Sequence, residues 1–304
     1  MTAAPGPVRL ILNGKKAARP EVRAAVQAVR QAGHPLEVRV TWEQDDAARL
    51  VAEAARDGIG RVIAGGGDGS VNEIAAGLMA IDQDSRPEMG ILPLGTANDF
   101  ATACGVPAEP SAALRLAVTA AAMPVDVGWA NDRWFVNVAS AGFGAAITAD
   151  TPVELKNFLG GGAYTIMGLL AALDFRPYDC AVRTPDGAVA GRFVVGAICN
   201  GRQAGGGQQL APTALLDDGL LDVVCLRPFP VAAAAQVAAE IAGLDRRGEY
   251  VVQMRLPWIE TDAADPIPVN LDGEPFRAPH IRFAVVPRGL RLALPPACPL
   301  LAGC

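Results

Sequence analysis

The chain has 304 residues, of which 51% are hydrophobic and 19% are charged. This composition excludes an intrinsically disordered protein, because such a chain can bury enough apolar surface to offset the entropy that it loses on ordering. Lys and Arg number 26 and Asp and Glu number 32, a formal net charge of −6, and this acidic balance argues against a nucleic-acid partner, which would need clustered positive charge.

The first part of the chain alternates strand-like and helical stretches. Strands are predicted at residues 8–13, 37–41, 61–64 and 89–94, and helices at residues 21–32, 45–56 and 71–80. Alternation of this kind is typical of a largely parallel sheet covered by helices. We therefore predict an α/β, Rossmann-like domain over residues 1–123.

From residue 124 onward, short strand-like runs separated by turn residues dominate. They span residues 125–129, 134–139, 180–183, 193–198, 220–225, 250–254, 258–261, 281–286 and 290–294, with helical stretches at residues 153–173 and 231–244. This pattern predicts a second, mostly antiparallel β domain over residues 124–304.

Cysteine usage and hydropathy indicate the compartment. Six cysteines are scattered without a Cys-x-x-Cys pair, which is typical of free thiols in a cytoplasmic protein. The longest uncharged stretch, residues 157–173, contains several glycines and falls short of the roughly 20 apolar residues of a membrane-spanning helix. No signal peptide is recognisable at the start of the chain. We expect a soluble, cytoplasmic protein.

The most informative segment is a glycine-rich turn at residues 65–70, between a predicted strand and a predicted helix. Glycines let the main chain approach a ligand closely and the helix N-terminus offers free N–H groups, so the turn is typical of a phosphate site. It lacks the Lys-Ser/Thr of a Walker A motif. The Asp68 carboxylate would repel phosphate unless a metal bridged them, which favours a Mg²⁺-nucleotide. The alternative is a tight turn capped by Ser70.

Three further segments carry polar residues on predicted turns. Residues 90–101 end the fourth strand in Gly-Thr, at the carboxyl edge where open α/β sheets bind ligands. The acidic turn at residues 217–219 could gather carboxylate and carbonyl oxygens around a hard cation, or it is a solvated hairpin turn. Residues 272–274 offer two carboxylates, and either could accept a hydroxyl proton, unless this too is an ordinary acidic turn.

These segments together resemble one family. Gly-Gly-Gly-Asp-Gly-Ser at residues 65–70 and Pro-Leu-Gly-Thr-Ala-Asn-Asp-Phe-Ala at residues 93–101 resemble the catalytic domain of the diacylglycerol kinase and sphingosine kinase superfamily. Asn-Gly-Arg-Gln-Ala-Gly-Gly-Gly-Gln-Gln-Leu-Ala-Pro at 200–212, Leu-Leu-Asp-Asp-Gly-Leu-Leu at 215–221 and Asn-Leu-Asp-Gly-Glu-Pro at 270–275 narrow the resemblance to the YegS-type bacterial lipid kinases. The resemblance covers nearly the whole chain. It implies that residues 1–123 form the nucleotide-binding catalytic domain and that residues 124–304 form a β-sandwich domain that closes the active-site cleft.

The resemblance implies where the ligands bind. It implies that ATP is bound by residues in three segments: Thr41; Gly66, Gly67, Asp68, Gly69, Ser70, Val71, Asn72 and Glu73; and Thr96. It implies a Mg²⁺ site, open to Ca²⁺, made by the Asp218 carboxylate and the backbone carbonyls of Leu215 and Leu220. It implies that Glu274 is the general base, with Asp272 as the alternative, and that Asp68 orients the metal or shares the proton transfer. The triple glycine at residues 205–207 is placed near the cleft.

The expected activity is transfer of the γ-phosphoryl group of ATP to a glycerolipid hydroxyl in phospholipid biosynthesis, with diacylglycerol and phosphatidylglycerol both open as acceptors. The rivals are a kinase for a soluble acceptor, akin to NAD kinase or phosphofructokinase, and a non-catalytic lipid-binding module. A lipid acceptor requires transient docking on the inner face of the membrane. We expect that contact at Lys156, Phe158 and Leu159. The alternative is that the apolar side chains of Phe158 and Leu159 pack in the core of the second domain. The oligomeric state is left open.

Overall fold

Parallel strands form the centre of the first domain in the computed structural model, which describes residues 6–142, 177–243 and 248–303. They are β1 (Val8–Asn13), β2 (Leu36–Thr41), β3 (Arg61–Gly66) and β4 (Glu88–Pro93), in the spatial order β2-β1-β3-β4. Strands β1, β3 and β4 are almost wholly buried, as expected of a sheet that is covered on both faces. Because the strands are parallel, their carboxyl ends share one edge of the sheet.

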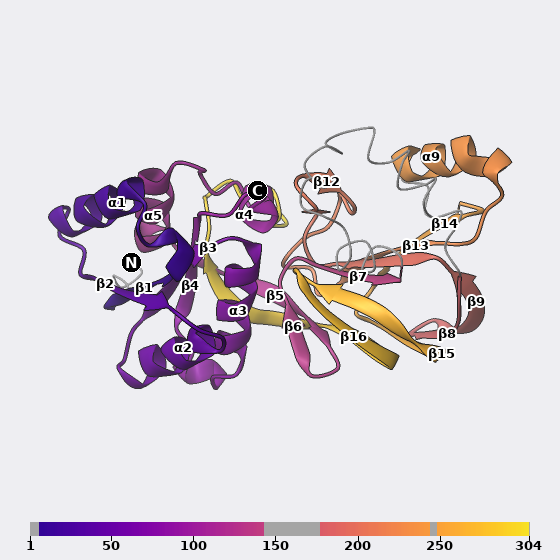
Figure 1. The fold of residues 1–304 in the computed structure, drawn as a ribbon, viewed down its shortest axis with the longest axis horizontal. Coiled ribbons are helices and arrows are strands. Elements are labelled where there is room, and N and C mark those ends of the chain that lie inside the picture. The colour runs from indigo at the N-terminus through magenta and orange to yellow at the C-terminus, as the bar shows by residue number, and fades with distance from the viewer. Residues whose placement is uncertain (1–5, 143–176, 244–247, 304) are drawn as a thin grey trace.

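Two pairs of helices cover this sheet (Figure 1). On one face lie α1 (Pro20–Gln31) and α5 (Pro110–Thr119), and on the other lie α2 (Asp46–Arg56) and α3 (Asp68–Met79). Helix α1 has Pro at its first position, and its buried Val22, Val26 and Val29 recur at helical spacing on one face. The short elements are η1 (Gly14–Lys16), η2 (Gln83–Ser85) and α4 (Asp99–Ala103).

The second domain is an antiparallel β-sandwich, which confirms the predicted fold class. One layer has the order β14-β13-β10-β7-β15, and the other contains β9, β8, β16, β5 and β6. The strands of this domain are β5 (Ala122–Ala130), β6 (Arg133–Phe135), β7 (Val138–Gly142), β8 (Tyr178–Thr184), β9 (Gly187–Phe193), β10 (Val195–Cys199), β11 (Gln203–Ala204), β12 (Gln208–Gln209), β13 (Leu221–Leu226), β14 (Val251–Leu256), β15 (Trp258–Leu271) and β16 (Glu274–Ala293).

Strand β15 belongs to both layers of the sandwich. Its residues 260–263 pair with β8, and its residues 269–271 pair with β7. Between these two parts, the register of β15 against β16 shifts between Asp262 and Ile267. Such a shift lets a strand turn the corner from one layer to the other.

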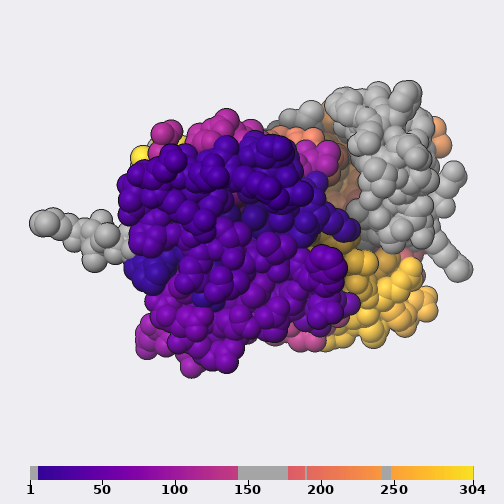
Figure 2. All heavy atoms as spheres, turned by 60° about the vertical axis from the view of Figure 1, so that its left-hand side comes forward, coloured from indigo at the N-terminus to yellow at the C-terminus, as the bar shows by residue number. Residues whose placement is uncertain are grey.

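Strand β16 joins the two domains. Leu292 pairs in parallel with Met89 of β4, so one sheet runs from the first domain into the second. Leu290, Leu292 and residues as far as Leu301 pack in the core of the first domain. Figure 2, turned so that the first domain comes forward, shows the late strands in yellow against its side.

Several predicted elements have different ends. The strands expected at residues 281–286 and 290–294 form the single strand β16, because residues 287–289 make a bulge against β5 rather than a turn. The strand expected at residues 134–139 divides into β6 and β7, because main-chain N–H groups between them donate to Asp272 instead. Helix α3 begins at Asp68 rather than at residue 71, and α4 and α5 were not predicted.

The predicted helix at residues 231–244 is present as η3 (Val231–Ala233) and α9 (Ala234–Gly243). The one at residues 153–173, and with it the docking contact expected at Lys156, Phe158 and Leu159, lies outside the described residues. Over the described part of the chain, no helix is long and apolar enough to cross a membrane.

Candidate active site

The glycine-rich turn lies at the carboxyl edge of the parallel sheet, between the end of β3 at Gly66 and the start of α3 at Asp68. It packs main chain against main chain on the loop after β4. A Cβ atom on Gly95 would lie 2.6 Å from the Cα atom of Gly67, so a side chain there would force the two loops apart. Because the N-cap residue is a glycine, the first N–H groups of α3 are free of a side-chain cap and are suited to bind phosphate.

The predicted ATP residues around this turn lie together at the sheet edge. The Asn13 side chain at the end of β1 donates from Nδ2 to Ser70 Oγ at 3.3 Å. Thr41, at the end of β2, is level with Asn13 in the strand register. Val71 and Asn72 are buried, with 2% and 5% of their surfaces exposed, so they pack inside the domain behind the exposed edge.

Asp68 connects the glycine turn to the loop that carries Thr96. Its Oδ1 accepts a hydrogen bond from the main-chain N–H of Phe100 at 3.1 Å. Asn98 closes the same loop by accepting from the N–H of Gly95 at 2.8 Å, which leaves Thr96 exposed at its tip. Burial raises the pKa of Asp68. A partly buried carboxylate next to a phosphate site has the oxygen chemistry that Mg²⁺ prefers, so Asp68 fits a metal that arrives with the nucleotide.

A contact between the two domains lies beside this loop. The main-chain N–H groups of Gly206 and Gly207 donate to the Asp99 carboxylate at 2.9 and 2.6 Å, and Gln203 Nε2 donates to the Asp99 carbonyl at 3.2 Å. The three glycines at 205–207 all have positive φ, a conformation in which successive N–H groups can surround an anion. The resemblance placed this loop near the cleft, but Asp99 was not among the predicted site residues. The consecutive glycines, which leave main-chain N–H groups in need of an acceptor, were the available signal.

The Asp272 carboxylate accepts hydrogen bonds from the main chain near the start of the second domain. Its Oδ2 accepts from the N–H groups of Val136 at 2.7 Å and Asn137 at 3.1 Å, and its Oδ1 accepts from Val138 at 2.8 Å. Burial raises the pKa of Asp272 to about 6 against the opposing effect of these N–H groups, and the nearby Asp68 adds to the rise. With both oxygens engaged, this carboxylate is less suited than Glu274 to accept a substrate proton.

Glu274 lies in a different environment. It is the exposed first residue of β16, and its carboxylate accepts no hydrogen bond from the described residues. Desolvation raises the pKa of Glu73 in α3, and the negative charge of Glu274 raises it further. The carboxylates of Glu73 and Glu274 are thus close enough for their charges to interact, and Glu274 remains open to a ligand.

The predicted metal turn lies apart from these residues. The Asp218 carboxylate accepts from the N–H of Leu220 at 3.0 Å through Oδ1, and its Oδ2 binds the guanidinium of Arg255. Arg255 also lies 3.5 Å from the Asp222 carboxylate. The neighbouring Asp126 accepts from the N–H of Gly219 at 2.7 Å, and burial raises its pKa.

This arrangement does not fit a metal ion. A site made of the Asp218 carboxylate and the carbonyls of Leu215 and Leu220 would suit a hard cation by its oxygen chemistry, but Arg255 already supplies the positive charge that such a cation would bring. Among the described residues, no three His, Cys, Asp or Glu side chains converge on one point. The metal site at Asp218 stays a prediction, and nothing in the mechanism proposed below depends on it.

Comparisons with known proteins agree with this architecture. The model of the diacylglycerol kinase catalytic domain matches residues 7–130, and the model of the YegS C-terminal NAD kinase beta sandwich-like domain matches residues 137–294. A solved structure of a diacylglycerol kinase from Bacillus anthracis str. Sterne aligns with a TM-score of 0.73 at 21% identity, over 96% of this chain and 98% of that one. That alignment supports the fold. The fold and the site define a two-domain kinase with a diacylglycerol kinase-type catalytic domain.

The full-length relatives narrow this class. A protein of Shewanella frigidimarina named "Probable lipid kinase YegS-like" is 48% identical over 97% of this chain and 96% of its own length. Relatives with the same name from Chromohalobacter salexigens and Serratia proteamaculans are 50% and 49% identical, each over 98% of this chain and over 96% and 97% of their own lengths. The chain belongs to the YegS-type lipid kinases. The predictions of this family and of a kinase are confirmed, which leaves the non-catalytic module without support.

Proposed function

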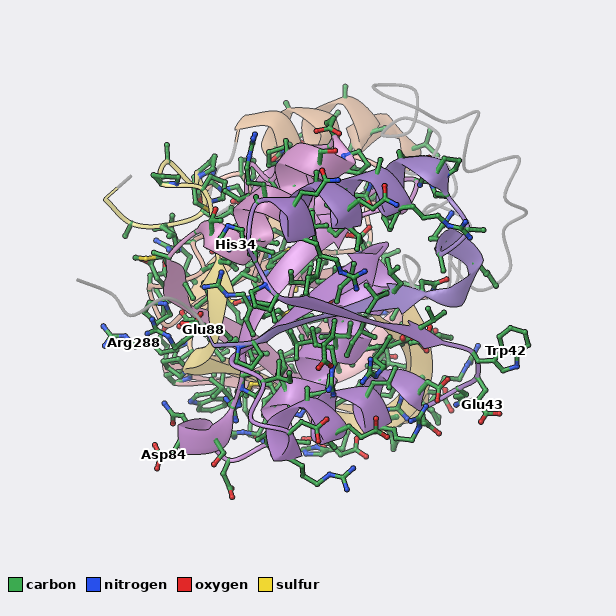
Figure 3. All side chains as sticks on the ribbon, turned by 90° about the vertical axis from the view of Figure 1, so that its left-hand side faces the viewer. His34, Trp42, Glu43, Asp84, Glu88 and Arg288 are labelled. Atoms are coloured by element: carbon green, nitrogen blue, oxygen red, sulfur yellow. The ribbon has the colours of Figure 1, made fainter. Side chains whose placement is uncertain are left out.

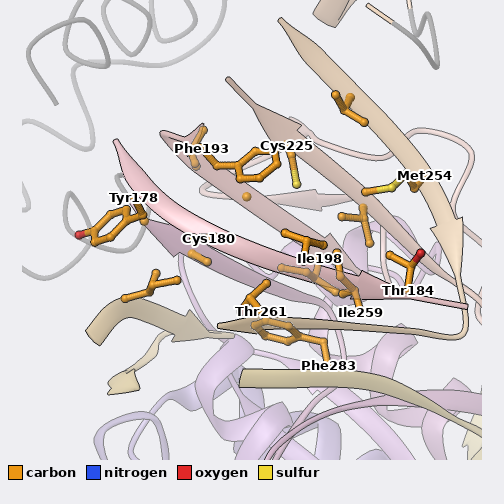
Figure 4. A pocket seen from close by; sticks show the side chains of 18 of the residues that line it. Tyr178, Cys180, Thr184, Phe193, Ile198, Cys225, Met254, Ile259, Thr261 and Phe283 are labelled. Atoms are coloured by element: carbon orange, nitrogen blue, oxygen red, sulfur yellow. The ribbon is translucent and has the colours of Figure 1, made fainter. Parts of the chain in front are cut away.

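We propose that the chain transfers the γ-phosphoryl group of ATP to a hydroxyl group of a glycerolipid, with diacylglycerol and phosphatidylglycerol as the first acceptors to test. The observation that carries the lipid acceptor is an apolar cavity between the two layers of the sandwich (Figure 4). Its volume is about 290 Å³, and side chains such as Phe193, Ile198, Met254 and Phe283 line it. A cavity of about 150 Å³ can hold a benzene molecule, so this one has room for a segment of one acyl chain.

Part of the cavity lies along β15, the strand that leads to the acidic turn at residues 272–274. Ala141 of β7 and Ile267 of β15 line it, and Ala141 pairs with Val269 two residues further along β15. Four residues of a β-strand span roughly 13 Å, which is the distance from Ile267 to the residue before Asp272. A lipid whose chain enters the cavity could therefore present its hydroxyl group near Glu274. A small polar acceptor has no use for such a cavity, which disfavours the kinases for soluble acceptors.

In the proposed reaction, the nucleotide phosphates rest on the first N–H groups of α3, with Thr41 and Thr96 as further contacts. Glu274 accepts the proton of the lipid hydroxyl while the hydroxyl oxygen bonds to the γ-phosphorus of ATP. The bond from that phosphorus to the oxygen that bridges it to the β-phosphorus breaks, which releases ADP. Asp68 would hold Mg²⁺ beside the phosphates, where the ion would neutralise part of their negative charge. Catalysis of this kind rests mainly on positioning and on stabilisation of charge.

Phosphorylation with radiolabelled ATP tests the proposal. Diacylglycerol or phosphatidylglycerol in mixed micelles should be labelled, and NAD and fructose 6-phosphate should not. Glu274→Gln should lower kcat by at least about a hundredfold, within the range of a general base. Labelling of the soluble acceptors alone would overturn the lipid assignment.

Two matched variants test the cavity itself. Ala141→Phe places a ring in the cavity, whereas Ala181→Phe places the same ring on the exposed face of β8. The first should lower kcat/KM for a long-chain acceptor while KM for ATP stays unchanged, and the second should leave both unchanged. A folded Ala141→Phe protein with wild-type activity on long-chain lipid would exclude the cavity as the acceptor site.

We also propose that the chain works in the cytoplasm and meets its acceptor by transient contact with the inner membrane surface. This follows from the lipid acceptor, whose hydroxyl group lies at the surface of a bilayer. Co-sedimentation with phosphatidylglycerol-containing vesicles tests the contact, and the Phe158→Ser, Leu159→Ser double variant tests whether residues 156–159 contribute to it.

A further inference from the structure

Trp42 is the most exposed large hydrophobic side chain among the described residues, with 92% of its surface exposed. Figure 3 shows it beyond the end of β2, with its ring directed away from the body of the molecule. Its main chain is nevertheless held firmly. The N–H groups of Trp42 and Glu43 donate to Oδ2 of the buried Asp46 at 2.6 and 3.1 Å, and these bonds together with Arg49 lower the pKa of Asp46 to about 2. These bonds hold the main chain of the turn that carries the exposed ring.

The position of Trp42 relates it to the glycine turn. Strand β2 pairs with β1, and β1 pairs with β3, with Thr41 level with Asn13 and Gly65 level with Leu12. Neighbouring strands lie about 4.8 Å apart, so the end of β2 is roughly 10 Å from the end of β3 along the sheet edge. A nucleotide whose phosphates occupy the glycine turn needs a similar distance to reach its base through the ribose.

The charges along this edge favour a nucleotide over a membrane. Lys15 and Lys16 lie in η1, directly after β1. Because β1 lies between β3 and β2 in the sheet, these cations follow the strand between the glycine turn and Trp42, where they would face phosphates. Glu43 and Asp45 are exposed beside Trp42. Their negative charges would repel an anionic lipid surface, whereas a purine base carries no charge to repel. An exposed ring between acidic side chains thus suits the uncharged end of a nucleotide.

We propose that Trp42 stacks on the purine base of the bound nucleotide. The proposal rests on the proposed function, because it takes the glycine turn as the phosphate site. Stacking on an aromatic side chain tolerates different bases, since every base has a π-face. Trp42 should therefore strengthen the binding of purine nucleotides in general and should not by itself select adenine over guanine.

Calorimetric binding of ADP, GDP and pyrophosphate to the full chain tests this proposal. Trp42→Ala should weaken ADP and GDP about tenfold, because a stacked base contributes roughly 1–3 kcal/mol and each 1.4 kcal/mol is a factor of ten. Pyrophosphate binding should not change. Trp42→Phe should restore most of the affinity for ADP. Val231→Ala is the matched control, because Val231 is also exposed, at 67%, and lies in the second domain.

Several outcomes would overturn the proposal. One is wild-type affinity for ADP in Trp42→Ala, and another is an equal loss for ADP and pyrophosphate, because stacking does not act on a ligand without a base. A third is normal ADP binding with lost co-sedimentation on phosphatidylglycerol-containing vesicles, which would make Trp42 a membrane contact. Base-dependent binding without transfer to any lipid would instead overturn the proposed function and leave this inference standing.

Discussion

Replacing Gly206 or Gly207 by Ala tests whether the contact with Asp99 holds the two domains in their working arrangement. Both glycines have positive φ, 88° and 98°, and a Cβ atom at either would meet no atom within 4 Å. Alanine would therefore cause no collision, and its effect would come from the main-chain conformation alone. A residue with a Cβ atom in the left-handed region costs about 1–2 kcal/mol, which favours a loop that leaves Asp99.

The expected size of the effect follows from this cost. The two N–H groups that donate to Asp99 are on the altered residues, and the carboxylate is buried, with 4% of the Asp99 surface exposed. A change of about 1–2 kcal/mol shifts the balance between docked and undocked loop by a factor of roughly 5–30. If the docked arrangement is the reactive one, kcat/KM should fall for both ATP and lipid, by at most this factor.

Gly33→Ala is the matched control for this strain. Gly33 has φ of 86° and no atom within 4 Å of its Cβ position, but it lies after the last turn of α1 and outside the candidate site. It should lower the free energy of unfolding in urea as much as Gly207→Ala does, without lowering kcat/KM in the radiolabel assay. Equal losses of activity in Gly33→Ala and Gly207→Ala, or wild-type activity in Gly207→Ala, would refute the reasoning.

Two further predictions concern buried charges. Arg255→Met should lower the free energy of unfolding by about 1–3 kcal/mol, because it leaves the Asp218 carboxylate without its guanidinium partner. Calorimetry of this variant should then detect Mg²⁺ or Ca²⁺ binding that is absent in the wild type and in the control Arg183→Met. Metal binding by the wild type that Asp218→Ala abolishes would contradict this prediction. The pKa of Asp272 is raised to about 6, above about 3.9 in an unfolded chain, so its contribution to the free energy of unfolding should fall as pH rises from about 4 to 6. Urea unfolding of the wild type and of Asp272→Asn should show that the difference between them shrinks over this pH range. A difference that is independent of pH would contradict the prediction.

The parallel sheet could be predicted from the sequence because each buried strand is a local apolar run that ends in turn residues. The predicted strand at residues 8–13 coincides with β1. The second domain depends more on remote contacts. The gap between β6 and β7 is made by Asp272, which lies more than 130 residues away, and residues 287–289 have the composition of a turn but form a bulge within β16. The local pattern of apolar and turn residues predicts neither the gap between β6 and β7 nor the bulge within β16.

The candidate site divides in the same way. The glycine turn and Asp68 could be recognised by residue type, because close main-chain approach and a helix N-terminus have a composition of their own. The partners of the acidic groups could not. Arg255 meets Asp218 across 37 residues and Gly207 meets Asp99 across 108, and only the folded chain brings them together. The acidic turn at residues 217–219 therefore predicted a metal without any sign of Arg255, whose guanidinium binds Asp218 in the structure.

The hairpin of β15 and β16 connects the proposed acceptor cavity, the proposed base and the junction of the domains. Ile267 and Phe283 line the cavity, Glu274 is the first residue of β16, and Leu292 pairs with the sheet of the first domain. The distance between the cavity and Glu274 is thus set by strand register, which changes only in steps of whole residues and also turns the side chains to the other face. An acceptor must span that distance to use both, and a lipid can do so because its chain and its hydroxyl are parts of one molecule. A short polar acceptor can occupy only the end near Glu274, so it gains nothing from the apolar cavity that makes up most of the proposed site.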